Sequence, residues 1–339
     1  IIKIIEKEFG KHKPLTVQRG LLHDYLGMTI DFSIVGKVMI TMIDMIEKML
    51  DDIPDDMNGV KNSPAQEHLF KVNEDGIRLS EDKRVIVHKN TAKLLFISQR
   101  ARPDVQTATS FLCTRVKEAD TDDYKKLARV MQYLRGTKYL PLILGADDSG
   151  NIYWYKDGAH AVHRDMRGHT GLMMTFGQGA VYARSLKQKL NTKSSTETEL
   201  VSFDDGMPQN LWALYFTKHQ GRFLRDNIVY QDNTSTIRMA ENGKMSTGKM
   251  TKHINIRYFF CNDRIKKGEL SVKYCPTLDM IADYFTKALQ GSLFRKLRDL
   301  ILGISPADFD EYKRRYEVIS IWRKQKKDEK EAASERDKS

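Results

Sequence analysis

Apolar side chains in the first 140 residues recur mainly at helical spacing. They stand three or four positions apart in 38–50, 91–101, 104–117 and 121–134. Such a stripe is typical of a helix that buries one face. A run with β-branched residues and one glycine, 21–33, predicts a strand pair ahead of these helices. Residues 51–90 are turn-rich and charged, and we expect a surface excursion there.

The pattern changes after a polar, glycine-bounded turn at residues 145–150. Short apolar and β-branched runs predict strands at 152–156, 172–176, 180–185, 228–232 and 270–274. Residues 177–179 (GQG) predict the hairpin turn between the second and third of these. The order βββαβααβα that results predicts an α/β domain with a mixed sheet.

Helical segments alternate with the later strands. The first begins at a capping box, 194–197 (SSTE), and its pattern runs to Tyr215 with a kink expected at Pro208. Further helical segments are expected through Ala240, over 254–267 and over 278–289.

Three parts of the chain follow from these patterns. They are a mostly helical part (1–144), an α/β domain (150–290) and a charged tail (305–339). The tail has no large apolar residue after position 322, which predicts disorder at its end. The chain begins without an initiating methionine or a cleavage signal, so we expect it to be a fragment of a longer protein.

The charge balance favours polyanionic partners. The chain has 56 Lys and Arg against 45 Asp and Glu, a net charge of +11. Nucleic acid is the leading partner class, because phosphate contacts release counterions. The alternative is that the excess charge only aids solubility. Three widely spaced cysteines predict neither a disulfide framework nor a cysteine zinc site, and no apolar run approaches the ~20 residues of a membrane span.

Four acidic residues stand where side chains can meet at one sheet edge. Asp157 follows the first predicted strand of the domain, Glu199 lies early in the long helix, Asp232 ends the fourth strand and Asp283 lies in the closing helix. Clustered carboxylates repel one another unless divalent cations neutralise them, and hard oxygen ligands suit Mg²⁺ or Mn²⁺. Two such ions ~4 Å apart support phosphodiester hydrolysis. Taken singly, each acid is equally well a turn former, a helix-start charge, a strand-end cap or a surface group.

Five segments together closely resemble the ribonuclease H of copia-type LTR retrotransposons. They are 155–159 (YKDGA), 194–199 (SSTETE), 230–233 (YQDN), 251–258 (TKHINIRY) and 282–287 (ADYFTK). The resemblance implies a ribonuclease H-like α/β fold that cuts the RNA strand of an RNA/DNA hybrid. It assigns catalysis and the binding of two Mg²⁺ or Mn²⁺ ions to Asp157, Glu199, Asp232 and Asp283. Glu199 is preferred to Glu197 because an apolar residue follows it.

Segments of the N-terminal part resemble the end of the reverse transcriptase of the same elements. They are 24–28 (DYLGM), 95–104 (LFISQRARPD) and 130–137 (VMQYLRGT). The resemblance implies a palm end followed by thumb and connection segments, with the upstream polymerase region of the polyprotein as a partner. The tempting pair Asp51-Asp52 ends a helical pattern, so we expect no polymerase activity.

Several basic residues are candidates for substrate contacts. We expect Arg100, Arg102, Arg129 and Arg135 to contact a nucleic-acid backbone, with a solvated helix face as the alternative for each. His253 lies in a segment of the resemblance and is a candidate site residue; contact with the nucleic acid, support of Asp232 and packing in the core are the roles left open for it. His160, His163 and His169 lack metal-ligand spacing and predict solvated loop histidines.

Two other functions remain open at this stage. One is an inactive or domesticated element fragment that binds nucleic acid without cutting it. The other is a transposase or integrase core, which lacks the counterparts of 251–258 and 282–287. For an element enzyme the resemblance implies an intracellular location, in cytoplasmic particles or the nucleus.

Overall fold

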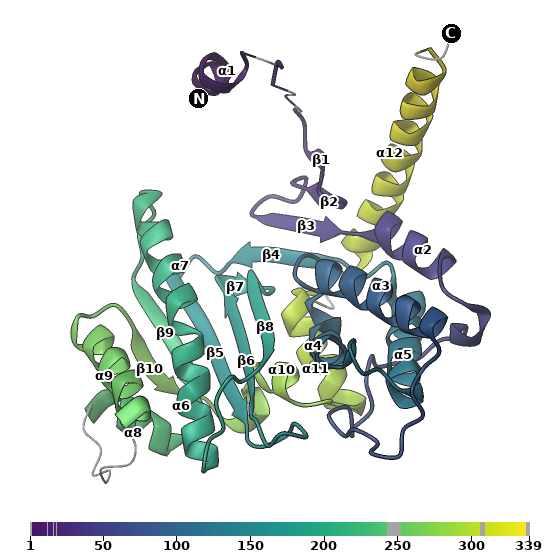
Figure 1. Cartoon of the computed structure of the whole chain (residues 1–339). Helices are drawn as coiled ribbons and strands as arrows, with labels where there is room; N and C mark the ends of the chain where they lie inside the picture. Colours follow the sequence, from purple (N-terminus) through teal and green to yellow (C-terminus); the bar gives the residue numbers. More distant parts are fainter. Residues whose placement is uncertain are drawn as a thin grey trace.

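The computed structural model describes residues 2–11, 13–15, 17, 19–242, 252–305 and 309–336. It is a mixed α/β structure with two five-stranded sheets, ordered β1-β2-β3-β4-β7 and β10-β9-β5-β6-β8 (Figure 1). None of the helices within these ranges is both long and apolar enough to cross a membrane.

The first sheet is antiparallel throughout. Its strands are β1 (Leu22–Tyr25), β2 (Met28–Asp31), β3 (Lys37–Thr41), β4 (Leu142–Ala146) and β7 (Gly177–Gln178). The predicted strand pair at 21–33 is confirmed as β1 and β2. Leu26 and Gly27 join them, both with positive φ, as a tight two-residue hairpin turn requires.

The helix predicted over 38–50 is wrong in its first half. Residues 37–41 form β3, which pairs with β4 from more than a hundred residues later, and only Ile43–Asp51 is helical (α2). A short apolar run is compatible with a helix or a strand, and here pairing with the distant β4 favours the strand.

The second sheet confirms the five strands predicted after residue 150. They are β5 (Asn151–Ala159), β6 (His169–Thr175), β8 (Tyr182–Lys187), β9 (Asp226–Gln231) and β10 (Ser271–Tyr274). β6 is antiparallel to both β5 and β8, whereas β9 is parallel to β5 and β10, so the sheet is mixed. The predicted turn at 177–179 also supplies β7, which pairs with β4 of the first sheet.

Helices cover both faces of the second sheet. Gly158 of β5 faces α6 (Ser195–Asp205), where an added Cβ would lie 2.8 Å from the Thr198 carbonyl oxygen. Gly171 of β6 faces α10 (Asp283–Thr286), where a Cβ would lie 2.6 Å from the Ala282 carbonyl oxygen. Asp157 is the cross-strand partner of Gly171, so it lies on the α10 face.

The long helix predicted from residue 194 is two helices. α6 ends before Gly206, and α7 (Met207–His219) begins directly after it. Pro208 lies in the first turn of α7, where a missing N–H costs nothing, so it starts a helix instead of kinking one.

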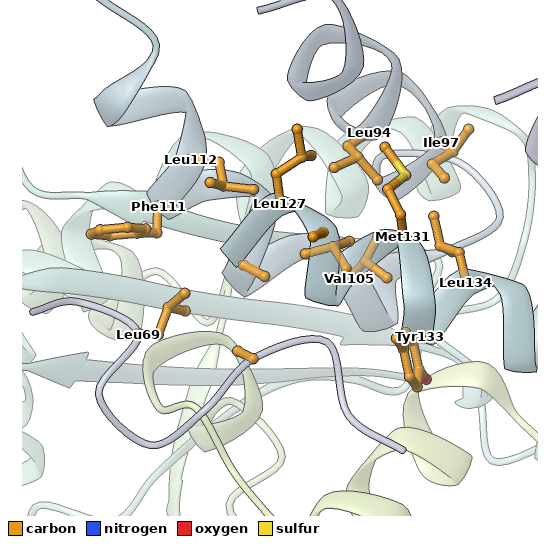
Figure 2. Close-up of a cluster of buried hydrophobic side chains, with 14 of the residues drawn as sticks. Leu69, Leu94, Ile97, Val105, Phe111, Leu112, Leu127, Met131, Tyr133 and Leu134 are labelled. Carbon is orange, nitrogen blue, oxygen red and sulfur yellow. The ribbon is translucent and has the colours of Figure 1, made fainter. Parts of the chain in front are cut away.

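The N-terminal helices are α3 (Glu81–Ser98), α4 (Gln106–Arg115) and α5 (Thr121–Thr137). Their apolar side chains face one another (Figure 2). Met57, Leu69 and Leu79 are buried in the same core, so residues 51–90 are not a surface excursion. Before the first sheet stands a short helix, α1 (Ile2–Phe9), and three 3-10 turns lie at Asp55–Met57, Pro103–Val105 and Thr277–Asp279.

The C-terminal helices differ most from expectation. α8 (Thr234–Asn242) and α9 (Lys252–Lys266) follow the predicted pattern, but the helix predicted over 278–289 is reduced to the four-residue α10. α11 (Gly291–Leu302) and α12 (Phe309–Arg336) come next. The end of the tail, predicted to be disordered from residue 323, belongs to α12 as far as Arg336.

One core joins the N-terminal helices to the second sheet. It includes Phe111 and Leu127 from the helices, Met173 from β6 and Phe285 from α10. The domain boundary at residues 145–150 remains a prediction of the sequence.

A buried polar network fixes α10 against the N-terminal helices. Arg102 and Asp104 form a two-pronged ion pair with N–O distances of 2.9 and 2.7 Å, and neither side chain is exposed. Tyr133 donates to the Asp104 carboxylate (2.7 Å), and Tyr284 of α10 donates to the Asp104 carbonyl oxygen (2.9 Å). Thr107 donates to the Tyr284 carbonyl oxygen (2.7 Å), so the network holds α10 through both side chain and backbone.

We expect Arg102→Met to lower the free energy of unfolding by about 3–5 kcal/mol, because it leaves the buried Asp104 carboxylate without its cation. Urea unfolding followed by circular dichroism measures the change. Arg84→Met is the matched control, since Arg84 pairs with Glu81 at the surface and should matter little. Equal stability of the two variants would contradict the central role of the buried pair.

Candidate metal centre

Three carboxylates meet at one edge of the second sheet. Asp157 lies on β5, Glu199 on α6 and Asp232 directly after β9. One oxygen of each lies within 4.8 Å of the others, and they are the one such group of metal-binding side chains among the described residues. Asp157 and Glu199 are buried, and Asp232 is half-buried.

The register of parallel strands brings the two aspartates together. β5 and β9 run side by side with Tyr155 opposite Tyr230, so both chains reach the same sheet edge two residues later. α6 approaches β5 closely because Gly158 has no side chain there, and Ser202 of α6 donates to the Asp157 carbonyl oxygen (2.6 Å). This close approach brings Glu199 to the aspartates.

Neutral donors orient each carboxylate. The Gln231 side chain donates through its amide nitrogen to Glu199 (3.3 Å), while its side-chain oxygen Oε1 accepts the backbone N–H groups of Asp232 and Asn233. Thr277 donates to Asp232 (3.1 Å), and the Thr286 hydroxyl of α10 donates to Asp157. The acids are therefore held in place without being neutralised.

Burial and mutual repulsion disfavour the charged forms of these acids. Burial, together with the charges of Asp157 and Asp232, raises the pKa of Glu199 well above its usual range. Burial and the charge of Asp157 also raise the pKa of Asp232, against the opposing effects of Thr277 and Lys287. A divalent cation would relieve both costs at once, so the donor set fits a hard metal ion.

Asp283 adjoins this group from α10. Burial and the neighbouring charge of Asp157 raise its pKa to about 7, although Lys287 opposes the shift. The Lys287 ammonium lies 2.7 Å from the Asp283 carboxylate and places a positive charge beside the acids. Burial lowers the pKa of Lys287, but the charges of Asp157, Asp283 and Asp232 outweigh it and leave the pKa raised.

The structure places the other predicted residues as follows. His253 lies in α9, and its side chain is outside the described part of the chain. Arg102 is fully buried in the ion pair with Asp104, so it has no exposed group for a nucleic-acid backbone, and this expectation is wrong. Arg100 lies over the Phe96 ring, and Arg135 donates to the carbonyl oxygens of Met57 and Gly59. Both are partly exposed.

The solvated-loop interpretation is wrong for two of the three histidines. His163 and His169 are buried beside the Phe70 ring, whereas His160 is exposed and contacts Thr198. Ser185 donates its only hydroxyl proton to the Phe285 carbonyl oxygen (2.7 Å). His169 therefore donates to Ser185 through Nε2 (2.7 Å) and accepts from His163 at Nδ1 (2.9 Å). The His169 ring is neutral in this chain of bonds, because one of its nitrogens donates and the other accepts.

Four contributing residues were not singled out from the sequence: Gln231, Thr277, Thr286 and Lys287. Lys287 had a local signal, because it lies four residues after Asp283 as helical neighbours do. Gln231 and Thr277 had none, since only the strand arrangement brings them to the acids.

Comparison with known proteins gives distant similarity to transposon polyproteins. No family model matches the chain. The Retrovirus-related Pol polyprotein from transposon TNT 1-94 of Nicotiana tabacum is 26% identical over 209 residues, 61% of this chain and 16% of that protein. The one from transposon RE2 of Arabidopsis thaliana is 27% identical over 196 residues, 57% of this chain and 13% of that protein. An uncharacterized mitochondrial protein of Arabidopsis thaliana is 29% identical over 99 residues, 29% of this chain and 41% of that protein.

The buried histidine pair predicts a loss of stability in mild acid. Burial, with Lys187 nearby, lowers the pKa of His163 to about 4, and burial lowers that of His169 well below its usual value. Unfolding frees both rings to titrate near pH ~6.5, so the unfolded chain binds more protons between about pH 4 and 6.5. We expect stability to be fully present above pH ~6.5 and to fall by up to ~1.4 kcal/mol per pH unit for each histidine below it.

The measurement is the urea midpoint between pH 7.5 and 4.5 for the wild type and His163→Gln. Carboxyl groups with raised pKa act in the opposite sense, so the difference between the two proteins isolates the histidine contribution. The variant should lose stability less steeply with acid. Parallel curves would show that His163 does not titrate on unfolding.

Proposed function

We propose that the chain is a metal-dependent ribonuclease H that hydrolyses the RNA strand of an RNA/DNA hybrid. The observation that carries the proposal is the convergence of Asp157, Glu199 and Asp232, from three separate elements, within 4.8 Å. A structural role alone gives no reason to gather three acids around one point, because their repulsion costs stability.

Fold and sequence support the same assignment. The second sheet has three antiparallel strands followed by two parallel ones, as the ribonuclease H-like order βββαβααβα requires. The similarity to Pol polyproteins of transposons covers about 60% of the chain. On this proposal residues 150–290 are the ribonuclease H domain of a copia-type element. Residues 1–144 are then the end of its reverse transcriptase, without polymerase activity, and the upstream region of the polyprotein is a partner.

The proposed cofactors are two Mg²⁺ or Mn²⁺ ions held by Asp157, Glu199, Asp232 and Asp283. When bound, such ions activate the attacking water and stabilise the leaving oxygen of a phosphodiester. The protein's own contribution is to aim the carboxylates. Thr286 fixes Asp157, Gln231 fixes Glu199 and Thr277 fixes Asp232.

On this proposal, the surface around the acids selects RNA/DNA hybrids over other nucleic acids. The wide, shallow groove of an A-like helix exposes 2′-hydroxyl groups, which identify the RNA strand. Lys287 supplies a positive charge beside the acids, and its side chain is about half exposed, so it is available to a phosphate of the substrate.

The first test is cleavage of a labelled RNA/DNA hybrid in Mg²⁺ by the full chain. We expect Asp157→Asn, Glu199→Gln and Asp232→Asn each to reduce the rate at least about 100-fold, since even partners of metal ligands cost 10–100-fold. Glu197→Gln is the matched control, because Glu197 accepts the backbone N–H of Lys193 instead of facing the aspartates. It should cleave like the wild type.

Single-stranded RNA, duplex DNA and hybrid without divalent ions should stay intact. Hybrid binding without any cleavage by the folded wild type would contradict the proposal and favour a fragment that binds nucleic acid only. Cleavage that survives in all three acid variants would place the activity elsewhere.

A further inference from the structure

A second cationic feature lies apart from the acids. A cavity of about 440 Å³ opens where the segment 60–63 and α5 meet the start of α11. Three of its lining residues are cations, Lys61, Arg129 and Arg295, and none of the described residues that line it is acidic. A cleft lined by one sign of charge attracts ions of the opposite sign.

Partly buried hydrogen bonds hold the cavity wall together. Ser63 is buried, and its hydroxyl lies 3.0 Å from the side-chain oxygen of Gln290. Arg129 donates to the Ser63 hydroxyl (3.0 Å), and Gln290 donates to the Ala65 carbonyl oxygen (2.8 Å). The Arg129 guanidinium is thus fixed in position before any ligand arrives.

The three cations lack acidic partners. Within the described residues no carboxylate pairs with Lys61, Arg129 or Arg295, and the buried Nε of Arg129 has no hydrogen-bond partner. Neighbouring cations of α11 are paired: Lys296 lies 3.1 Å from Asp279, and Arg298 2.8 Å from Asp299. Burial lowers the pKa of Arg129, as expected for a guanidinium with no compensating anion.

The start of α11 adds to the same field. The helix begins at Gly291, and the Gln290 side chain does not cap it. The first backbone N–H groups of a helix lack partners within it and carry partial positive charge. An anion in the cavity therefore meets fixed cations and the positive end of a twelve-residue helix.

The cavity is close to the acids along the chain. Lys287, which contacts Asp283, precedes Gly291 by four residues. Four residues span at most ~14 Å, which corresponds to roughly four base steps of ~3.4 Å along the axis of a nucleic-acid duplex. We infer that the cavity of Lys61, Arg129 and Arg295 binds a backbone phosphate of the substrate, a few nucleotides from the phosphodiester at the acids. This inference rests on the proposed function and names a second contact of the same substrate.

The test is hybrid binding by the full chain, followed by fluorescence anisotropy in EDTA so that cleavage cannot occur. We expect Arg295→Gln to weaken binding about tenfold at low salt, the loss of one charge-assisted hydrogen bond, and to reduce the slope of log affinity against log salt by ~0.9. Arg129→Gln should act in the same direction. Lys296→Gln is the matched control, because it removes the same charge from the next residue of the same helix and should bind within about twofold of wild type.

A separate arm uses inorganic phosphate, which should raise the melting temperature of the wild type but not of Arg129→Gln. If Arg295→Gln and Lys296→Gln weaken hybrid binding equally, the effect comes from the overall positive charge of the protein, and the cavity is not a specific phosphate site. A third outcome is that inorganic phosphate stabilises the wild type while Arg295→Gln leaves hybrid binding unchanged. The cavity would then bind free phosphate, and the inference that it binds the substrate backbone would be wrong.

The outcomes separate this inference from the proposed function. Cleavage by the wild type with unchanged binding in Arg295→Gln rejects the cavity and leaves the nuclease. Weakened binding in Arg295→Gln by a chain that does not cleave supports the cavity and rejects the nuclease.

Discussion

The docking of α10 is the constraint on which the rest of the candidate site depends. This helix has only four residues, too few to be stable by itself, yet it carries Asp283 and the hydroxyl that binds Asp157. Its position comes from buried bonds to Asp104, Thr107 and Ser185, which belong to the N-terminal helices and to β8. The Arg102–Asp104 pair therefore supports the positions of the acids indirectly, because it helps to hold α10 in place.

A second constraint is the electrostatic cost of burying like charges close together. Buried carboxylates that repel one another are held by neutral donors and by the nearby Lys287. The negative charge of the site is therefore not fully compensated, and a divalent cation would neutralise it. The cavity beside α11 is the reverse case, with cations fixed in place and no acid among the described residues that line it. On the proposed function, a phosphodiester backbone and the bound metal ions would complement both.

Local sequence patterns predicted the strands of the second sheet and the hairpin of β1 and β2 because alternation and turn residues act over a few positions. These patterns gave wrong predictions where a segment distant in the sequence determined the local conformation. Residues 38–41 became a strand because β4 lies beside them, and 51–80 joined the core because the helices left an apolar surface to cover. The buried histidine pair escaped prediction for the same reason, since His169 of β6 bonds to Ser185 of β8, which in turn donates to Phe285 of α10.

The sequence by itself determined which acids stand at strand ends and helix starts, the order of elements in the second sheet and the excess of positive charge. Only the tertiary structure decided that Asp157, Glu199 and Asp232 meet, that Arg102 is used inside the protein, and that Lys61, Arg129 and Arg295 share one cavity. The reason is physical. Spacing along a chain controls local conformation, whereas distances between remote side chains depend on how sheets and helices pack.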